Sequence, residues 1–189
     1  TRYLPYKVMK PKLSQWLQKS IMEGEATGKM ILKGHLTDFP FDNMPEEQGL
    51  FLVDSDWQKF SLDYKPEWPP GKLMHAHIIF KNRDLTAEIN EGMIDQLPLN
   101  DIKAQIPALG SGRETLMIQG HLNTDAANAR HFVLNSGLKK NLNAFEHMYI
   151  AGPAVFDVDI QIPLYPENND NIVNGKVNFL GGEFILPEW

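Results

Sequence analysis

The sequence predicts a mainly β protein: antiparallel strands that form a sheet with one apolar face, built from repeated modules and accompanied by two or three short amphipathic helices. Three observations predict this class. Apolar and polar residues alternate along many short segments, Gly and Pro separate these segments, and a similar order of segments recurs roughly 125 residues later. An alternation with a period of two is typical of a strand with one buried side.

The segment of residues 154–165 shows this alternation most clearly. Its apolar positions are Phe156, Val158, Ile160 and Ile162, and its polar positions are Asp157, Asp159 and Gln161. Since successive side chains of a strand point to opposite faces, this strand has one apolar and one acidic face. The same construction recurs in two further sets, Met30, Leu32 and Leu36, and Leu116, Ile118 and Leu122. We therefore expect most of the chain to build one sheet with one apolar face.

Local signals place the elements of the first two thirds of the chain. An amphipathic helix is expected over residues 13–21, and Gly24 ends it. Turns are expected at residues 54–56, at residues 81–84, at Gly92, at Pro98 and at Pro107. The expected strands are residues 29–37, 49–53, 60–64, 72–80, 85–91, 97–106 and 114–122.

After residue 123 the period changes to that of a helix. Thr124 or Asp125 is suited to cap a helix over residues 126–133, and Asn135-Ser136-Gly137 ends it. Residues 138–145 are expected to form a second helical piece. A strand over residues 147–163 follows, and residues 175–179 and 183–186 are expected to form a final hairpin about Gly181-Gly182.

The order of these elements repeats along the chain. The helix at Leu13 corresponds to the one at Leu138, the strand at Gly28 to the one at Gly152, and Pro66-Glu67-Trp68 to Pro187-Glu188-Trp189. Matching offsets of roughly 120 to 126 residues predict an internal duplication. We expect residues 1–124 to be a first β-groove module with its N-terminal helix, and residues 125–189 to be a helical junction and the start of a second module. The missing N-terminal Met indicates an excised piece of a longer protein.

Composition excludes several classes of function. The chain has 18 basic and 24 acidic residues, a net charge of −6. Affinity for nucleic acid depends mainly on clustered Lys and Arg residues. This chain lacks such clusters, so nucleic acid is not expected as a partner. The absence of cysteine excludes disulfides, thiol nucleophiles and thiolate metal ligands. The sequence shows neither a signal peptide nor an apolar run of the roughly 18 residues that span a bilayer.

No motif predicts catalysis, and we expect neither an enzyme nor a cofactor. His75 and His77 share a strand face, but two surface histidines are the more ordinary interpretation than a metal site. Asp54 and Asp56 could open a calcium loop, yet Lys59 stands where that loop requires Gly. Asp157 and Asp159 are expected on a solvated face. Trp16, Trp57 and Trp68 could stack on a sugar or a base, but each is expected to cover an end of the sheet.

Several phrases resemble the YhdP and AsmA-like, TamB-related family of large envelope proteins of Gram-negative bacteria. They are GHLTDFPF at residues 34–41, FSLDYKPEWP at residues 60–69, FKN at residues 80–82, FVLNSGL at residues 132–138 and IQIPL at residues 160–164. The resemblance covers nearly the whole chain in order. The sequence departs from the family at Gly137, where Pro is typical.

The resemblance implies a periplasmic segment of a bridge-like protein, anchored in the inner membrane outside this chain, that moves phospholipid between the inner and outer membranes along an apolar groove. Phospholipid acyl chains are then the main partner, with other envelope proteins and a second copy of the chain as further ones. The expected lining consists of Met30, Leu32, Leu36, Leu116, Ile118, Leu122, Phe156, Val158, Ile160 and Ile162.

Two alternatives remain open at the level of sequence. Periodicity alone favours a sheet folded into a sandwich, in which the same apolar residues form a dry core. The protein would then be a structural or protein-interaction β-rod of the cell envelope. The family resemblance instead favours an elongated, curved antiparallel sheet that forms an open groove or half-pipe, and this is the fold that we expect.

Overall fold

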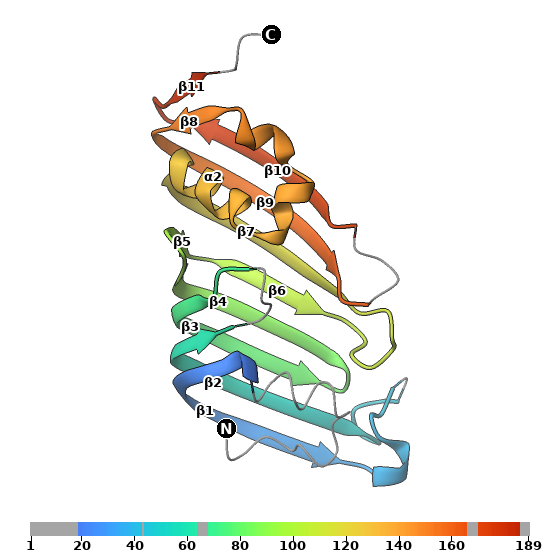
Figure 1. Cartoon of the computed structure of the whole chain (residues 1–189). Coiled ribbons are helices and arrows are strands. Elements are labelled where there is room, and N and C mark those ends of the chain that lie inside the picture. Colours follow the sequence, from blue (N-terminus) through green and yellow to red (C-terminus); the bar gives the residue numbers. More distant parts are fainter. Residues whose placement is uncertain (1–18, 43, 64–67, 166–169, 186–189) are drawn as a thin grey trace.

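The computed structural model describes residues 19–42, 44–63, 68–165 and 170–185, and shows one open antiparallel sheet of nine strands (Figure 1). The strand order is β1-β2-β3-β4-β6-β7-β9-β10, with β5 paired to β4 beside this path. Two short strands, β8 and β11, form a separate ladder. The predicted class, a mainly β open antiparallel sheet that does not close into a barrel, is confirmed.

The strands follow one another in space almost as they do in the sequence, and β1 and β10 are the two edges. Their bounds are β1 Ile21–Lys33, β2 Leu50–Leu62, β3 Gly71–Lys81, β4 Asp84–Ile94, β5 Leu97–Leu99, β6 Ile102–Ile106, β7 Thr115–Asp125, β8 Tyr149–Ala151, β9 Pro153–Pro163, β10 Ile172–Phe179 and β11 Glu183–Ile185. Strands β1 to β4 are a meander, because each antiparallel strand is joined to the next by a local connection.

The register places apolar side chains on one face across all eight strands of the path. Directly opposite residues of an antiparallel pair lie on the same face. One such row runs from Ile78 through Ala87, Ala104, Ile118 and Ile160 to Val173, and on β1 and β2, where this row has Gly28 and Ser55, the adjacent row of the same face supplies Met30 and Val53. The neighbouring row on the other face runs through Thr27, Asp56, His77, Glu88, Lys103, Gln119, Asp159 and Asn174. We call these two surfaces the apolar face and the polar face.

A line of β-bulges crosses the first three strands. The register shifts between Glu23 and Glu25 on β1, between Trp57 and Phe60 on β2, and between Lys72 and His75 on β3. Lys59 and Leu73, inside these bulges, have positive φ angles of 51° each. A bulge adds a residue to one strand and increases its twist, so a line of bulges bends the sheet. Beyond the bend, Phe60 and Met74 pair with each other and are 4% and 3% exposed.

Helix α2, Ala126–Leu134, and the two 3-10 helices η2, Gly137–Lys140, and η3, Asn143–Glu146, lie beside β7 to β10 in Figure 1. Asp125 caps α2, since its carboxylate accepts a hydrogen bond from the backbone N–H of Ala127 at 2.8 Å. The main buried cluster joins Leu122, Ala126, Ala154 and Phe156 to Phe60 and Met74. The core is therefore the apolar face itself, together with the helices that pack on it.

Several expected boundaries are wrong. Residues 54–56 form no turn, because β2 runs unbroken from Leu50 to Leu62. β4 continues through Gly92 to Ile94, and residues 97–106 divide into β5 and β6. Residues 175–179 and 183–186 do not form a hairpin, since β10 pairs with β9 and β11 pairs with β8.

At the N-terminal end, residues 19 and 20 of the expected helix are helical, whereas Ile21 already belongs to strand β1, which continues through Gly24; residues 13–18 lie outside the described residues. Leu36 belongs to the 3-10 helix η1, Leu36–Asp38, and not to a strand. In the described part of the chain, α2 is an α-helix and the second helical piece consists of η2 and η3. The sheet continues across residues 124 and 125, and the division into two modules stays a prediction.

We expect Gly24→Ala to lower the free energy of unfolding by more than Gly112→Ala. Both glycines have positive φ, 126° and 90°, so alanine strains either backbone by about 1–2 kcal/mol. At Gly24 the added Cβ would also lie 2.5 Å from Cβ of Phe60, whereas at Gly112 no atom lies within 4 Å. Urea denaturation of both variants measures the difference, and equal losses would contradict the close approach of β1 and β2.

Candidate functional site

The apolar face is the candidate functional site, because it extends beyond the area that the helices cover. Its row nearest to the β3–β4 turn contains Val53, Phe80, Leu85 and Ile106, which are half-buried. At the β1 edge the face is open, since Met30 is 61% and Leu32 is 49% exposed. A contiguous group of accessible apolar side chains on a sheet face is typical of an interaction surface.

The ten residues expected to line a groove divide into three groups. Leu116, Ile118 and Val158 are half-buried on the apolar face. Leu122, Phe156, Ile160 and Ile162 are on the same face but buried, at 6–8% exposure. Met30 and Leu32 are exposed on β1, and Leu36, 69% exposed, lies outside the sheet. The first two groups share one face by register, and Leu36 does not belong with them.

A second buried cluster closes the β9 end of the face. It joins Trp68, from the connection between β2 and β3, to Leu138 of η2 and to Ile160 and Ile162 of β9. The Trp68 ring also lies 6.1 Å from the Phe132 ring of α2, measured between centroids. Trp68 is thus part of the cover over β9, the strand next to the β10 edge of the sheet.

Sequence reasoning missed several members of the apolar face. Phe80, Leu85, Ile89 and Ile106 belong to it, together with Ala87 and Ala104. The alternation of Leu85, Ala87 and Ile89 with Thr86 and Glu88 is a signal that could have found the β4 members. No signal in the sequence connects Trp68 to Ile160, since this contact depends on the curvature of the sheet.

The polar face carries histidine–carboxylate pairs between neighbouring strands. His77 Nε2 lies 2.6 Å from Asp54 Oδ1, His121 Nδ1 lies 2.6 Å from Asp157 Oδ1, and His75 Nδ1 lies 3.5 Å from Glu91 Oε2. The hydrogen bond that His77 donates to Asp54 raises the pKa of His77, and the charges of Asp54, Asp56 and Glu88 add to this effect. Among the described residues, no group of three or more His, Asp or Glu side chains is arranged to hold a metal ion.

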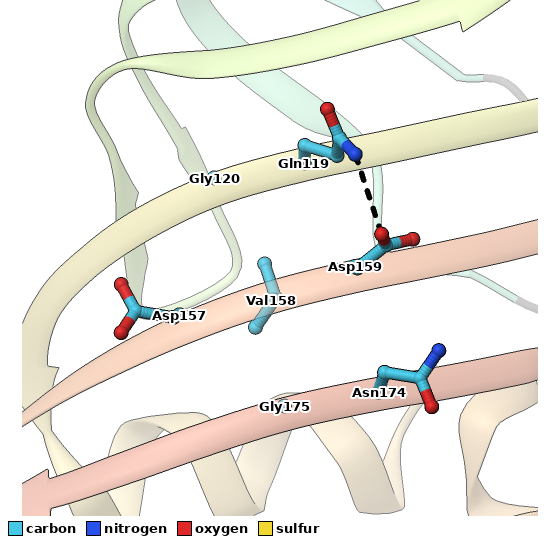
Figure 2. A pocket seen from close by; sticks show the side chains of 7 residues that line it. All are labelled: Gln119, Gly120, Asp157, Val158, Asp159, Asn174 and Gly175. Atoms are coloured by element: carbon cyan, nitrogen blue, oxygen red, sulfur yellow. Dashed lines mark hydrogen bonds between the residues drawn. The ribbon is translucent and has the colours of Figure 1, made fainter.

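A shallow hollow on the polar face lies over Val158, between Gly120 and Gly175 (Figure 2). Its polar side chains are Gln119, Asp157, Asp159 and Asn174. Gln119 donates a hydrogen bond of 3.3 Å to Asp159, and Asp157 is paired with His121. Both carboxylates therefore have partners within the sheet, and the hollow has the chemistry of a solvated face. Asp157 and Asp159 lie on the polar face, as expected.

Over the residues that the structure describes, no helix has the length and apolar character needed to cross a bilayer.

An open antiparallel sheet with one continuous apolar face defines a β-groove protein of the AsmA-like type. The chain belongs to the YhdP family, since the family model described as "YhdP protein" matches residues 1–189. This is a family of cell-envelope proteins. None of the curated proteins and none of the solved structures compared with the chain matches it.

We expect Asp54→Asn to destabilise the protein more at pH 6 than at pH 9. Because the pKa of His77 is raised in the folded state above its usual 6.5, the ionised pair contributes its full stability below pH 6.5 and loses it as the pH rises through the folded pKa. The expected loss at pH 6 is on the order of 0.5 kcal/mol, as for a surface pair. Urea denaturation at both pH values measures it, with Glu47→Gln as the control. A loss that does not depend on pH would contradict the ionised pair.

Proposed function

We propose that this chain is a periplasmic segment of a bridge-like envelope protein, anchored in the inner membrane outside this chain, and that the apolar face conducts phospholipid acyl chains between the inner and outer membranes. The observation that carries the proposal is the continuous apolar register from β1 to β10. Membership in the YhdP family supports the location in the cell envelope.

The physical reason is the cost of exposing an acyl chain to water. That cost is about 0.8 kcal/mol per methylene, so a bare chain of sixteen carbons costs on the order of 12 kcal/mol. Eight strands spaced about 4.8 Å apart span roughly 34 Å, whereas one acyl chain spans about 15 Å, half of a bilayer core. A face of this length offers an acyl chain successive positions without a return to water.

The half-buried row of Val53, Phe80, Leu85 and Ile106 is the best candidate for the lining in the centre of the sheet. These side chains are accessible yet flanked by apolar neighbours, as a conducting surface requires. The polar face, with its paired charges, keeps the opposite side of the sheet hydrated. The segment needs no catalytic group and no cofactor for this role, and other envelope proteins would be further partners.

A second candidate function is a structural or protein-interaction rod with a closed core. It is favoured by the cover over β9, where Leu138, Ile160 and Ile162 are at most 8% exposed. In such a rod, changes on the polar face, such as Asp157→Lys, would affect partner binding more than changes on the apolar face.

We expect the half-buried row of Val53, Phe80, Leu85 and Ile106 on the unaltered chain to be labelled by a phospholipid that carries a photoactivatable diazirine in its acyl chain. The phospholipid is supplied in phosphatidylethanolamine–phosphatidylglycerol vesicles. Peptide mass spectrometry identifies the labelled residues. Labels at Phe80, Leu85 or Ile106 and none at polar-face neighbours such as Gln105 are the expected result. Labelling confined to the polar face, or none on either face, would favour the closed rod.

We also expect Ile106→Asp to reduce total labelling several-fold, because it places a charge in the acyl path. Gln105→Asp is the matched control, since it puts the same charge on the preceding residue of β6, whose side chain lies on the polar face. Circular dichroism establishes that both variants are folded. Equal labelling of the two variants would contradict a path along the apolar face.

A further inference from the structure

The side chain of Trp68 covers part of the apolar face. It lies three residues before Gly71, the first residue of β3, yet it is buried against η2 and α2, which pack beside β7 and β9. Four strand spacings of about 4.8 Å, some 19 Å, separate β3 from β9 along the sheet. Three residues span at most about 10 Å. The contact therefore requires a curved sheet, and the indole lies over its apolar face.

The residues around the Trp68 indole leave space for the ring. Glycine at position 137 leaves room for the ring, because an added Cβ there would lie 2.6 Å from Nε1 and 2.9 Å from Cε2 of Trp68. Phe132 of α2 lies beside the ring, tilted by 60°. The other walls of the cluster are Leu138, Ile160 and Ile162, which are 2%, 8% and 6% exposed.

The apolar face does not end at Trp68. The row that includes Ile78, Ala87 and Ile118 reaches Ile160 on β9 and continues to Val173 on β10. Before this point the row is half-buried, at Ile160 it is buried, and at Val173 it is half-buried again. Trp68 and η2 thus cover one section of the otherwise continuous apolar face.

We propose that the section of the face walled by Phe132, Leu138, Ile160 and Ile162 is an acyl-chain binding site that Trp68 occupies in the absence of lipid. The indole and an acyl chain compete for this site, so Trp68 sets the affinity of this section of the apolar face for acyl chains. This inference rests on the proposed function and adds to it a named site and a residue of the chain that competes with the ligand.

The test compares Trp68→Ala with the unaltered chain, using the same diazirine phospholipid in phosphatidylethanolamine–phosphatidylglycerol vesicles. We expect labelling of Ile160 and Ile162 to rise about tenfold, while labelling of Phe80 and Leu85 changes little. Trp57→Ala is the matched control, since Trp57 is another indole on the apolar face and lies on β2 outside this cluster. It should leave labelling of Ile160 unchanged.

Gly137→Ala is the second variant, and it decides the question if Trp68→Ala does not fold. It keeps the indole but displaces it, so it should also raise labelling of Ile160. Unchanged labelling at Ile160 and Ile162 in the folded variants, with Phe80 and Leu85 still labelled, would overturn the competition and leave the proposed function intact. Loss of labelling from the whole apolar face in the unaltered chain would instead contradict the proposed function.

Discussion

Antiparallel register is the constraint on which the rest of the structure depends. Directly opposite residues share a face, so one apolar row can cross eight strands only if every pair keeps its register. A shift by a single residue between β7 and β9 would place Asp157 and Asp159 among Ile118 and Leu122. The alternation of residue types thereby selects the pairing, and the pairing separates an apolar from a charged surface.

Curvature and cover then decide how much of the apolar face remains accessible. The bulges on β1 to β3 bend one end of the sheet and direct Phe60 and Met74 into the core. The helices and Trp68 cover the other end, over β9. The half-buried row of Val53, Phe80, Leu85 and Ile106, near the β3–β4 turn, lies outside both of these regions. A single sheet face is thus core in some places and accessible surface in others.

The open sheet and most of its strands could be predicted from the sequence, because alternation with a period of two is a local signal. The bulges could not, since Lys59 and Leu73 are residue types that rarely adopt positive φ. The residues Asp54, Ser55 and Asp56 predict a turn, yet Asp54 and Asp56 are polar-face positions of one long strand. The cover was also missed, because the contact of Trp68 with Phe132 joins distant parts of the chain.

A surface that conducts lipid has to bind it weakly at each position, and the cover over β9 fits this requirement physically. A buried tryptophan removes about 150–250 Å² from water. An acyl chain that replaces it gains a similar apolar contact while the indole loses its own, so the two contributions largely offset each other. An open pocket of the same shape would hold the chain by the full burial energy and slow its departure. Competition by a side chain of the protein lowers the affinity of that section for acyl chains without adding a polar group to the apolar face.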